Sequence, residues 1–547
     1  MTEMVAKFAT LWPEIALLVG ACLCLVTGLS PSQAVRNATV WVAAASLVAA
    51  ALLVPVVGVP DIKLGLGPMT VFVKLTVVGV GLVLLLVTAG VPASLKQVAA
   101  ADRARRFEPG DTTRGEFFAF FLFSLTGLML AASADDLVWL FLALELVSLP
   151  TYVMVATSRD RVDAQEAAVK YFFLGALSVA VFLYGFALIY GATGFTQFAI
   201  HNADGELVGG IAAVAQAELA VGGTLSPLLM TGLVLAVLGI AFKIAAVPMH
   251  FYAADVYQGA NGAVTAFLAF VPKFAGFIAI IILLTPVGWP LPWPLMAVLW
   301  AMAALTMTAG NVLALLQTNV KRVLAYSSVA HSGYALVGVL AGPAAARAAD
   351  GALSDGIAAV LFYLIAYGVG TIAAFAVLGS LRARGDEAQT YDDLAGLRHR
   401  QPGLAAIMVI AVLSLLGLPP LVGFVGKLYI IGAAFSAQFD GYIWLIVLLV
   451  LNSAVSAAYY LRIASVCFFG RPDDAVQALP LPSRRTGAAV AGLAAIVLGI
   501  GGAQLVDMSA TAASRVGEFE RFDMTHPAAD ADPANPATDA PATAARR

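Results

Sequence analysis

The chain has 547 residues, of which 61% are hydrophobic and 12% are charged, and its net charge is −3. Because a soluble domain carries about 25% charged residues, this composition excludes a soluble globular protein and indicates an integral membrane protein. The sequence contains no block of basic residues, so we do not expect nucleic acid as a partner. Its three cysteines form no metal-ligand or disulfide pattern, and it carries no Walker A, haem or iron–sulfur signature.

Fourteen apolar runs are long enough to cross a bilayer, which takes roughly 20 residues per helix. In chain order they lie near residues 11–30, 38–59, 69–90, 116–133, 135–157, 166–192, 227–252, 263–285, 291–310, 323–342, 355–381, 403–437, 441–470 and 486–509. The long link between residues 192 and 227 includes an Ala- and Val-rich stretch that fits a surface helix. The segment 510–547, rich in Ala, Pro, Asp and Thr, cannot form a core and is expected to be disordered. The predicted fold class is therefore an all-α polytopic membrane protein.

Basic residues gather in alternate links between these runs. One set of links holds seventeen lysines and arginines, whereas the other set holds only Lys63 and Arg347. Basic links face the cytoplasm in membrane proteins. Both termini are therefore expected on the outer side of the membrane.

Five of the nine lysines fall inside or at the edge of apolar runs: Lys74, Lys170, Lys243, Lys273 and Lys427. A charge at the centre of a membrane is costly, so each buried one is a functional candidate. Lys74 is the weakest candidate, because it lies near the start of the third run, where its side chain can extend to the lipid headgroups.

Two pairs of charged residues near the ends of runs can be explained by contacts within their own segment. Glu166 and Lys170 are spaced i, i+4 at the start of the sixth run, in the favourable orientation for a helical ion pair. A local structural pair and a functional coupling pair fit this spacing equally well. Asp135 and Asp136 fill the turn between the fourth and fifth runs, where a helix cap is the simplest interpretation.

Glu145, Lys243, Lys273 and Lys427 lie much deeper in their runs. Each has several mostly apolar residues on both sides, so its charge cannot easily reach the membrane surface. We interpret these four as functional charges rather than structural ones.

Two of the deep lysines lie near interruptions of their helices. Pro248 follows Lys243 in the seventh run, and Pro419 and Pro420 precede Lys427 in the twelfth. Membrane helices tolerate proline. The two interrupted helices are five apart, however, and run in opposite directions. Broken helices at matching places of inverted repeats mark ion sites in transporters.

A row of buried lysines can carry protons. Burial weakens the hold of a lysine on its proton, and a neighbouring carboxylate strengthens it again. A lysine near Glu145 can therefore switch between two states. His250 and His331 are candidate bridging groups, although a lone histidine is as often a hydrogen-bonded structural residue.

Four stretches of the chain resemble the antiporter-like membrane subunits of respiratory complex I. They are FLALELVSLPTYV (141–153), FKIAAVPMHFYAADVYQGA (242–260), NVLALLQTNVKRVLAYSSVAHSGY (311–334) and GLPPLVGFVGKLY (417–429). The resemblance covers about residues 110–470. The third stretch is the most specific, because a long mixed motif is hard to match by chance.

Within that family the chain resembles the N type of bacterial NADH:quinone oxidoreductase, the counterpart of mitochondrial subunit 2. The M type has a glutamate at the helix 12 position, where this chain has Lys427. The L type continues into a long lateral helix, where this chain has a Pro-rich tail. The family's usual TPDVYQGAP is AADVYQGAN here, and Pro272 stands where a small residue usually precedes the helix 8 lysine. These departures put local loop geometry in doubt.

The resemblance implies two inverted five-helix units with broken helices 7 and 12. The predicted domains are 1–115 with helices 1–3 and a basic cytoplasmic loop, 116–285 with helices 4–8, 291–470 with helices 9–13, helix 14 at 486–509 and the tail 510–547.

It also implies roles for the deep charges. Glu145 and Lys243 are expected to be the coupled pair of one half-channel, Lys273 the central relay, and Lys427 the terminal lysine of the other half-channel. His331 is expected on the polar axis between them.

The implied assembly is a proton-translocating enzyme in the bacterial plasma membrane, with both termini of this chain on the periplasmic side. This subunit is expected to hold no redox centre. FMN, iron–sulfur clusters and quinone are expected in partner subunits. The expected partners are the antiporter-like M and L types, the small A, J and K types and the lipid bilayer.

Two alternatives stay open on the sequence alone. A subunit of a related cation/proton antiporter would carry the same lysines without a redox partner. A membrane scaffold would use the buried charges only as ion pairs.

Overall fold

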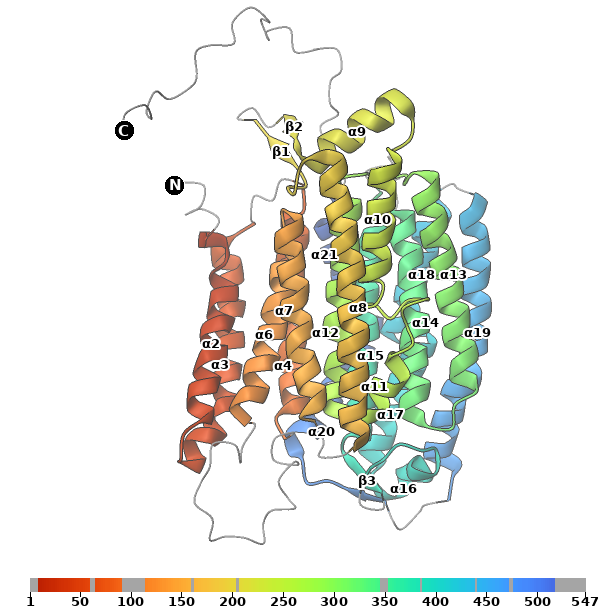
Figure 1. Ribbon diagram of the computed structural model, residues 1–547. Helices are drawn as coiled ribbons and strands as arrows, with labels where there is room; N and C mark the ends of the chain where they lie inside the picture. The colour runs from red at the N-terminus through yellow and green to blue at the C-terminus, as the bar shows by residue number, and fades with distance from the viewer. Residues whose placement is uncertain are drawn as a thin grey trace, which may run out of the picture.

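A computed structural model of the chain describes residues 8–59, 64–90, 114–158, 162–202, 206–344, 353–383, 386–437, 440–471 and 476–516. Most of these residues lie in helices that run roughly side by side and form a long bundle (Figure 1). The predicted all-α fold class is therefore confirmed. The predicted basic loop before residue 114 and most of the predicted tail, 517–547, lie outside the described residues.

The helices follow the predicted runs closely. The N-terminal three are α2 (Trp12–Gly28), α3 (Gln33–Val57) and α4 (Gly67–Thr88). The next group comprises α6 (Arg114–Ala132), α7 (Leu137–Ala156), α8 (Val162–Thr193), α10 (Pro227–Ile240), α11 (Ala253–Gly259) and α12 (Gly262–Leu284). The last group comprises α13 (Trp293–Leu315), α14 (Val320–Ala341), α15 (Gly356–Leu378), α17 (Pro402–Leu416), α18 (Val422–Ser436), α19 (Asp440–Phe469), α20 (Pro482–Ile500) and α21 (Ala503–Ala513).

Small elements close the two ends of the bundle. The antiparallel pair β1 (Ile200–His201) and β2 (Leu207–Gly209) lies at one end beside α9 (Gly210–Gly222), which is the surface helix expected in the long link (Figure 1). At the other end, β3 (Leu381–Ala383) pairs antiparallel with both β4 (Asp386–Glu387) and β5 (Val476–Ala478). The helical turns η3 (Asp392–Leu394) and α16 (Leu397–Arg400) follow this sheet.

Eleven helices within the described residues are long and apolar enough to cross a membrane. The helix α2 is shorter, with 17 residues. The run predicted over 227–252 consists of α10 and an irregular segment that leads to α11, and the run predicted over 403–437 is divided into α17 and α18. The total of fourteen crossings and the inverted repeats stay predictions.

The break between α17 and α18 has a clear local cause. Gly417 has a φ of 87°, and the amides of Gly417 and Leu418 donate to the carbonyls of Ser414 and Leu413, which is a Schellman ending. Pro419 and Pro420 then supply no backbone N–H, so the helix cannot continue through them. A new helix begins at Val422.

The C-terminal end of the bundle differs from the sequence prediction. The run predicted over 486–509 is two helices, α20 and α21, with Gly501 and Gly502 between them. Glycine is a poor helix former, which explains the interruption. The second helix continues to Ala513, so the first residues of the tail predicted from residue 510 are helical.

The prediction for Lys74 was wrong. Its side chain does not extend to the membrane surface but is buried, and its Nζ lies 2.8 Å from a carboxylate oxygen of Glu14 on α2. Lys74 also donates to the carbonyl of Thr10 at 3.1 Å. The lysine therefore joins α4 to the beginning of α2.

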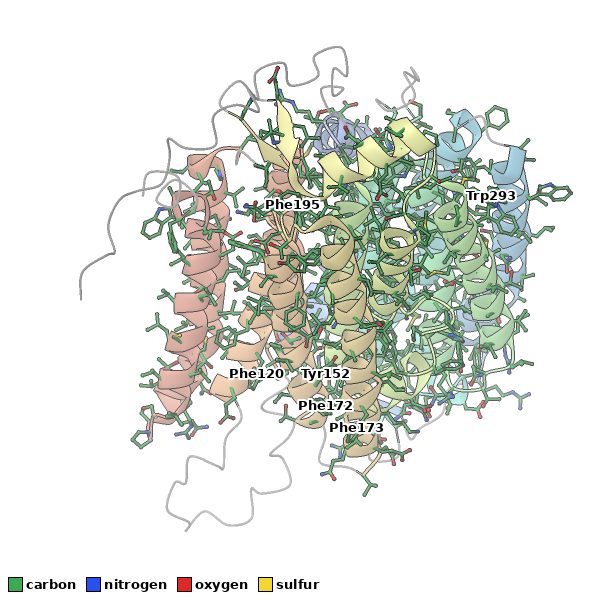
Figure 2. The ribbon with its side chains drawn as sticks, turned by 45° about the horizontal axis from the view of Figure 1, so that its top comes forward. Phe120, Tyr152, Phe172, Phe173, Phe195 and Trp293 are labelled. Atoms are coloured by element: carbon green, nitrogen blue, oxygen red, sulfur yellow. The ribbon has the colours of Figure 1, made fainter. Side chains whose placement is uncertain are left out.

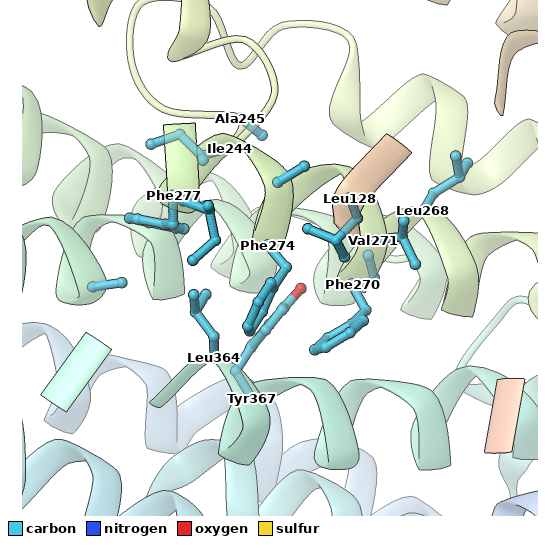
Figure 3. Close-up of a cluster of buried hydrophobic side chains, with 14 of the residues drawn as sticks. Leu128, Ile244, Ala245, Leu268, Phe270, Val271, Phe274, Phe277, Leu364 and Tyr367 are labelled. Atoms are coloured by element: carbon cyan, nitrogen blue, oxygen red, sulfur yellow. The ribbon is translucent and has the colours of Figure 1, made fainter. Parts of the chain in front are cut away.

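The centre of the bundle is formed by α12 and α15, which are buried along their whole length, and by α14. Figure 3 shows Phe270 and Phe274 of α12 packed beside Tyr367 of α15. The polar side chains of α12 and α15 are consequently enclosed within the bundle. Buried polar groups need partners, so their contacts define the candidate site.

The outer helices present apolar side chains to the surroundings. Phe173 on α8 and Trp293 at the start of α13 are both 66% exposed, and they lie toward opposite ends of the bundle (Figure 2). Broad exposure of this kind fits a protein surrounded by lipid and by other membrane subunits.

Candidate functional site

Glu145 and Lys243 form an ion pair inside the bundle. The Nζ of Lys243 lies 3.2 Å from Oε1 of Glu145, and it also donates to the hydroxyl of Ser148, which lies about one helical turn after Glu145 on α7. The lysine side chain is 2% exposed, whereas that of Glu145 is 16% exposed. The sequence prediction that a lysine lies beside Glu145 is confirmed.

Lys243 lies on the irregular segment that follows α10. The helix ends at Ile240, and Ala245 has a φ of 53°, which is uncommon for a residue with a side chain. Side chains from neighbouring elements bind the freed backbone groups. Ser332 donates to the carbonyl of Ile244, and the amide of Val247 donates to Thr306 at 2.9 Å. Irregular backbone at membrane depth is tolerated only where it is satisfied in this way.

Lys273 lies at the middle of α12, next to Pro272, and contacts α14. Its Nζ donates to the carbonyl and to the hydroxyl of Ser328, the latter at 2.6 Å. The hydroxyl of Tyr367 on α15 also donates to Ser328, at 2.7 Å, and the Lys273 Nζ lies 5.0 Å from the centre of the Tyr367 ring. In the part of the chain that the structure describes, no carboxylate forms an ion pair with Lys273.

His331 lies on α14, one turn after Ser328. Its Nδ1 is 2.6 Å from the hydroxyl of Tyr363, and its Nε2 is 3.0 Å from that of Tyr460. Its ring centre lies 5.2 Å from that of Tyr367, which Lys273 contacts, and 5.6 Å from that of Tyr334, which Lys427 contacts. The histidine is therefore situated between the central and the terminal lysine.

Lys427 binds the end of the helix before the break. It lies on α18, and its Nζ donates at 2.7 Å to the carbonyl of Leu416, the last residue of α17. The Nζ also lies 5.2 Å from the centre of the Tyr334 ring. Helix C-termini carry partial negative charge, and aromatic faces attract cations, so both contacts stabilise the ammonium group.

Asn311, Asn452 and Tyr459 form a further buried polar cluster next to Tyr334, which the sequence analysis did not identify. Asn311 on α13 donates to Tyr334 at 2.9 Å and accepts from Tyr459 at 2.8 Å. Asn452 on α19 accepts from Asn311 at 3.3 Å. The stretch 311–334 contains Asn311 and Tyr334, and an asparagine in an apolar run was the available signal.

The Glu166 and Lys170 pair lies apart from the row formed by Glu145, Lys243, Lys273, His331 and Lys427. The two groups are 2.8 Å apart, and Lys170 also contacts Asp255 on α11 at 2.9 Å. Asp255 in turn contacts Arg322 at 2.7 Å. Lys170 is 43% exposed, so this cluster borders the surface and ties α11 to its neighbours. A cavity of about 180 Å³ opens beside these residues.

The other candidate histidine does not join the row. His250 lies on the irregular segment after α10 and stacks on Phe251 with a centroid distance of 4.6 Å. Within the described residues, its Nδ1 has no hydrogen-bond partner. The structure therefore gives no contact between His250 and any of the buried lysines.

Comparison with known proteins identifies the class to which this arrangement belongs. Residues 134–456 match the family model described as NADH:quinone oxidoreductase/Mrp antiporter, TM. The match covers more than half of the chain and includes all the residues of the buried row. The protein is therefore an antiporter-like, multi-pass membrane protein.

Individual relatives narrow this class. The chain is 42% identical over 362 residues to NADH-quinone oxidoreductase subunit N of Trichlorobacter lovleyi, a match that covers 66% of this chain and 68% of the relative. It is 35% identical over 503 residues to the subunit N of Thioalkalivibrio sulfidiphilus, covering 91% and 97% of the two chains. A chain of respiratory complex I from Thermus thermophilus with bound aureothin is 30% identical, with a TM-score of 0.69 and coverage of 91% and 99%. The chain belongs to the family of NADH-quinone oxidoreductase N subunits.

Proposed function

We propose that this chain translocates protons as a membrane subunit of NADH:quinone oxidoreductase, through the row Glu145, Lys243, Lys273, His331 and Lys427. The observation that carries the proposal is that these groups, which are far apart in the sequence, lie inside the bundle and have polar partners. The three lysines and His331 are buried, and Glu145 is 16% exposed. Charged groups of this kind are costly in a membrane and mark ion pathways.

Two serines of α14 contact the segments that carry the first two lysines. Ser332 donates to the carbonyl of Ile244, which follows Lys243 in the chain, and the carbonyl of Ser328, 3.3 Å away, is the alternative acceptor for the same hydroxyl proton. Ser328 accepts from Lys273 through its hydroxyl and its carbonyl. Serine hydroxyls both donate and accept, so they can hand a proton onward or orient a bridging water.

Lys243 holds its proton through a side-chain carboxylate that can move. When Lys243 is paired with Glu145, its charge is compensated, and when the carboxylate moves away the buried ammonium becomes unstable. The proton then passes to the next group in the row. Because the interior has a low effective dielectric constant, the release at one lysine is sensed by its neighbour.

Partner subunits would supply the energy. We propose that FMN, iron–sulfur clusters and quinone belong to those subunits, that this chain carries no redox centre, and that M, L, A, J and K types surround it. We also propose that both termini face the periplasm. The alternating distribution of basic links in the sequence supports this orientation.

A cation/proton antiporter subunit is the second candidate. The description of the matching family model names Mrp antiporters as well as the oxidoreductase, which favours keeping this candidate in the test. An antiporter would use the same lysines but would be driven by an ion gradient.

Purification of the native complex separates the two candidates. The oxidoreductase predicts that the chain co-purifies with NADH dehydrogenase activity and with flavin and iron–sulfur absorbance, and that proteoliposomes acidify when NADH and quinone are added. Isolation without flavin or iron–sulfur absorbance, together with cation-driven proton movement, would contradict the proposal and support the antiporter. A Lys74→Met, Glu14→Gln variant is the matched control, because it removes a buried ion pair that lies outside the row.

A further inference from the structure

A carboxylate from a loop is bound to the beginning of the central helix α12. Both oxygens of Glu387, on β4, accept from the amide of Gly262 at 3.0 and 2.9 Å. Gly262 is the first residue of α12, where backbone amides lack partners inside the helix. A negative charge at this position is favourable because of the helix dipole and because a charged acceptor strengthens the hydrogen bond.

The same carboxylate binds the beginning of α14. Lys321, the second residue of that helix, forms an ion pair with Glu387 and donates to the carbonyl of Ala260 at 3.0 Å. The Lys321 side chain is 0% exposed. An ammonium group at the positive end of a helix is unfavourable unless an anion compensates it. Glu387 therefore compensates the N-terminus of α12 and the buried lysine at the beginning of α14.

A backbone and a side-chain hydrogen bond hold Gln389, two residues after Glu387, beside the beginning of α14. The amide of Val320 donates to the carbonyl of Gln389 at 2.7 Å, and the side chain of Asn319 donates to that of Gln389 at 3.2 Å. These contacts, together with those of Glu387, Lys321 and Gly262, form what we name the Glu387 junction. It lies at the end of the bundle that carries β3 and α16 (Figure 1).

The two helices joined by the junction are the ones that meet again at Lys273 and Ser328. Lys273 lies eleven residues after Gly262, or about 17 Å along α12, and Ser328 lies seven residues after Lys321, or about 10 Å along α14. A shift of either helix along its axis would therefore separate the Lys273 ammonium from the Ser328 hydroxyl, which are 2.6 Å apart.

We propose that Glu387 is a positioning residue that fixes the relative axial placement of α12 and α14 and thereby the contact between Lys273 and Ser328. The inference rests on the proposed function, because it treats Lys273 as the central relay. Glu387 does not carry the proton. It acts through Gly262 and Lys321, which connect it to the two helices.

The first test measures the junction itself in the intact complex. Glu387→Gln should increase hydrogen–deuterium exchange at the Gly262 amide by about tenfold, because its charge-assisted hydrogen bond to Glu387 is lost. The matched control is Asp392→Asn, which makes the same change in charge at an exposed carboxylate of the following turn η3. Unchanged exchange at the Gly262 amide in Glu387→Gln would overturn the proposal, whatever the function of the chain.

The second test connects the junction to the relay. A double-mutant cycle on protons pumped per electron compares Glu387→Gln, Ser328→Ala and the combination. A positioning role predicts that Glu387→Gln lowers the ratio several-fold in the wild-type background and has little further effect once Ser328→Ala is present. Additive losses would overturn the positioning role and indicate a general structural one.

A third variant distinguishes a loss of positioning from a failure of the complex to fold and assemble. Glu387→Gln leaves Lys321 buried without its anion, so Glu387→Gln with Lys321→Met removes both charges and should assemble better than Glu387→Gln alone. In this pair, raised exchange with a lowered pumping ratio supports positioning, and an unchanged ratio with raised exchange contradicts it. If Ser328→Ala and Lys273→Met both pump normally, the proposed relay fails, while the exchange measurement still decides the junction.

Discussion

The two broken helices carry lysines whose charges are balanced in different ways. At the break between α10 and α11, Lys243 faces the carboxylate of Glu145 on another helix, at 3.2 Å. At the break between α17 and α18, Lys427 donates to the backbone carbonyl of Leu416 and lies over the ring of Tyr334. Within the described residues, Lys427 has no carboxylate partner.

The difference indicates how each site can release a proton. A carboxylate on a side chain can move, so the charge of Lys243 can be stabilised or destabilised by a small displacement of Glu145. The carbonyl of Leu416 belongs to a helix end and cannot be neutralised. At that site the lysine itself must gain and lose the proton, so we expect the two breaks to respond differently to substitution.

The largest effect is expected at the paired site. Glu145→Gln or Lys243→Ala should lower proton pumping and the coupled quinone reductase activity by about a hundredfold, the scale at which removal of a proton-transfer group acts. Each single change leaves its partner charge buried and unpaired, so a loss of stability of about 3–5 kcal/mol is also expected. Proteoliposome pumping, with native gels to check assembly, measures both effects. Normal turnover in an assembled Glu145→Gln, Lys243→Ala double variant would remove this pair from the pathway.

A smaller effect is expected from Lys427→Arg. Arginine keeps the charge and can still donate to Leu416, but it does not deprotonate in proteins. Pumping should therefore fall by about tenfold while the complex assembles normally. The matched control is Lys74→Arg, the same substitution at a buried lysine outside the row. Wild-type pumping with Lys427→Arg would show that Lys427 is a fixed positive charge and would contradict the proposed difference between the two breaks.

Removal of the prolines tests the geometry of the second break. Pro419→Ala with Pro420→Ala restores two backbone N–H groups and allows α17 to extend toward α18, which would displace the Leu416 carbonyl from Lys427. We expect pumping to fall a few-fold. Pro402→Ala is the control, because Pro402 is at the first position of α17, where proline is well tolerated. Equal pumping by the two variants would show that the break is not required.

The smallest effect on pumping is expected at Glu14 and Lys74. This pair is buried like Glu145 and Lys243 but lies on α2 and α4, outside the row. Glu14→Gln should lower the thermal stability of the complex, since it leaves Lys74 unpaired, while protons pumped per electron stay unchanged. A lowered ratio of protons per electron would place this pair in the proton pathway and contradict its assignment as a structural pair.

The sequence predicted the features whose physical cost is visible in one run of residues. A lysine in an apolar helix and a proline inside a span are both costly, so Lys243, Lys427 and the two breaks could be found without a structure. The pairing of Lys243 with Glu145 was expected from the family resemblance, because burial shows that a charge needs a partner but not which residue supplies it.

Other contacts left no such signal. Ser328 and Tyr367 bind Lys273, but hydroxyl groups are common in membrane helices and often bond within their own helix, so nothing distinguishes these two in the sequence. Asp255 lies on the short helix α11 and Glu387 on the short strand β4, where an acidic residue is ordinary. Their lysine partners come from helices that are distant in the chain.

For Lys74 the sequence led to a wrong prediction rather than to a missed contact. Its position near the end of a span fits a lysine that extends to the headgroups, and the sequence offers no sign that Glu14, sixty residues earlier, packs against it. Spacing along one helix predicts partners within that helix only. Partners across helices depend on packing, which the apolar pattern does not specify.

Lys273→Met in the assembled complex tests the proton row most directly. Lys273 contacts Ser328 and Tyr367, which are both neutral, so its removal leaves no charge without a partner in the described part of the chain. Ser328 keeps its hydrogen bond with Tyr367, and little stability should be lost. The measurement is the number of protons moved per NADH oxidised in proteoliposomes, beside the Glu14→Gln, Lys74→Met control. The proposed relay predicts a lowered ratio with normal assembly, and a wild-type ratio from fully assembled Lys273→Met enzyme would contradict it.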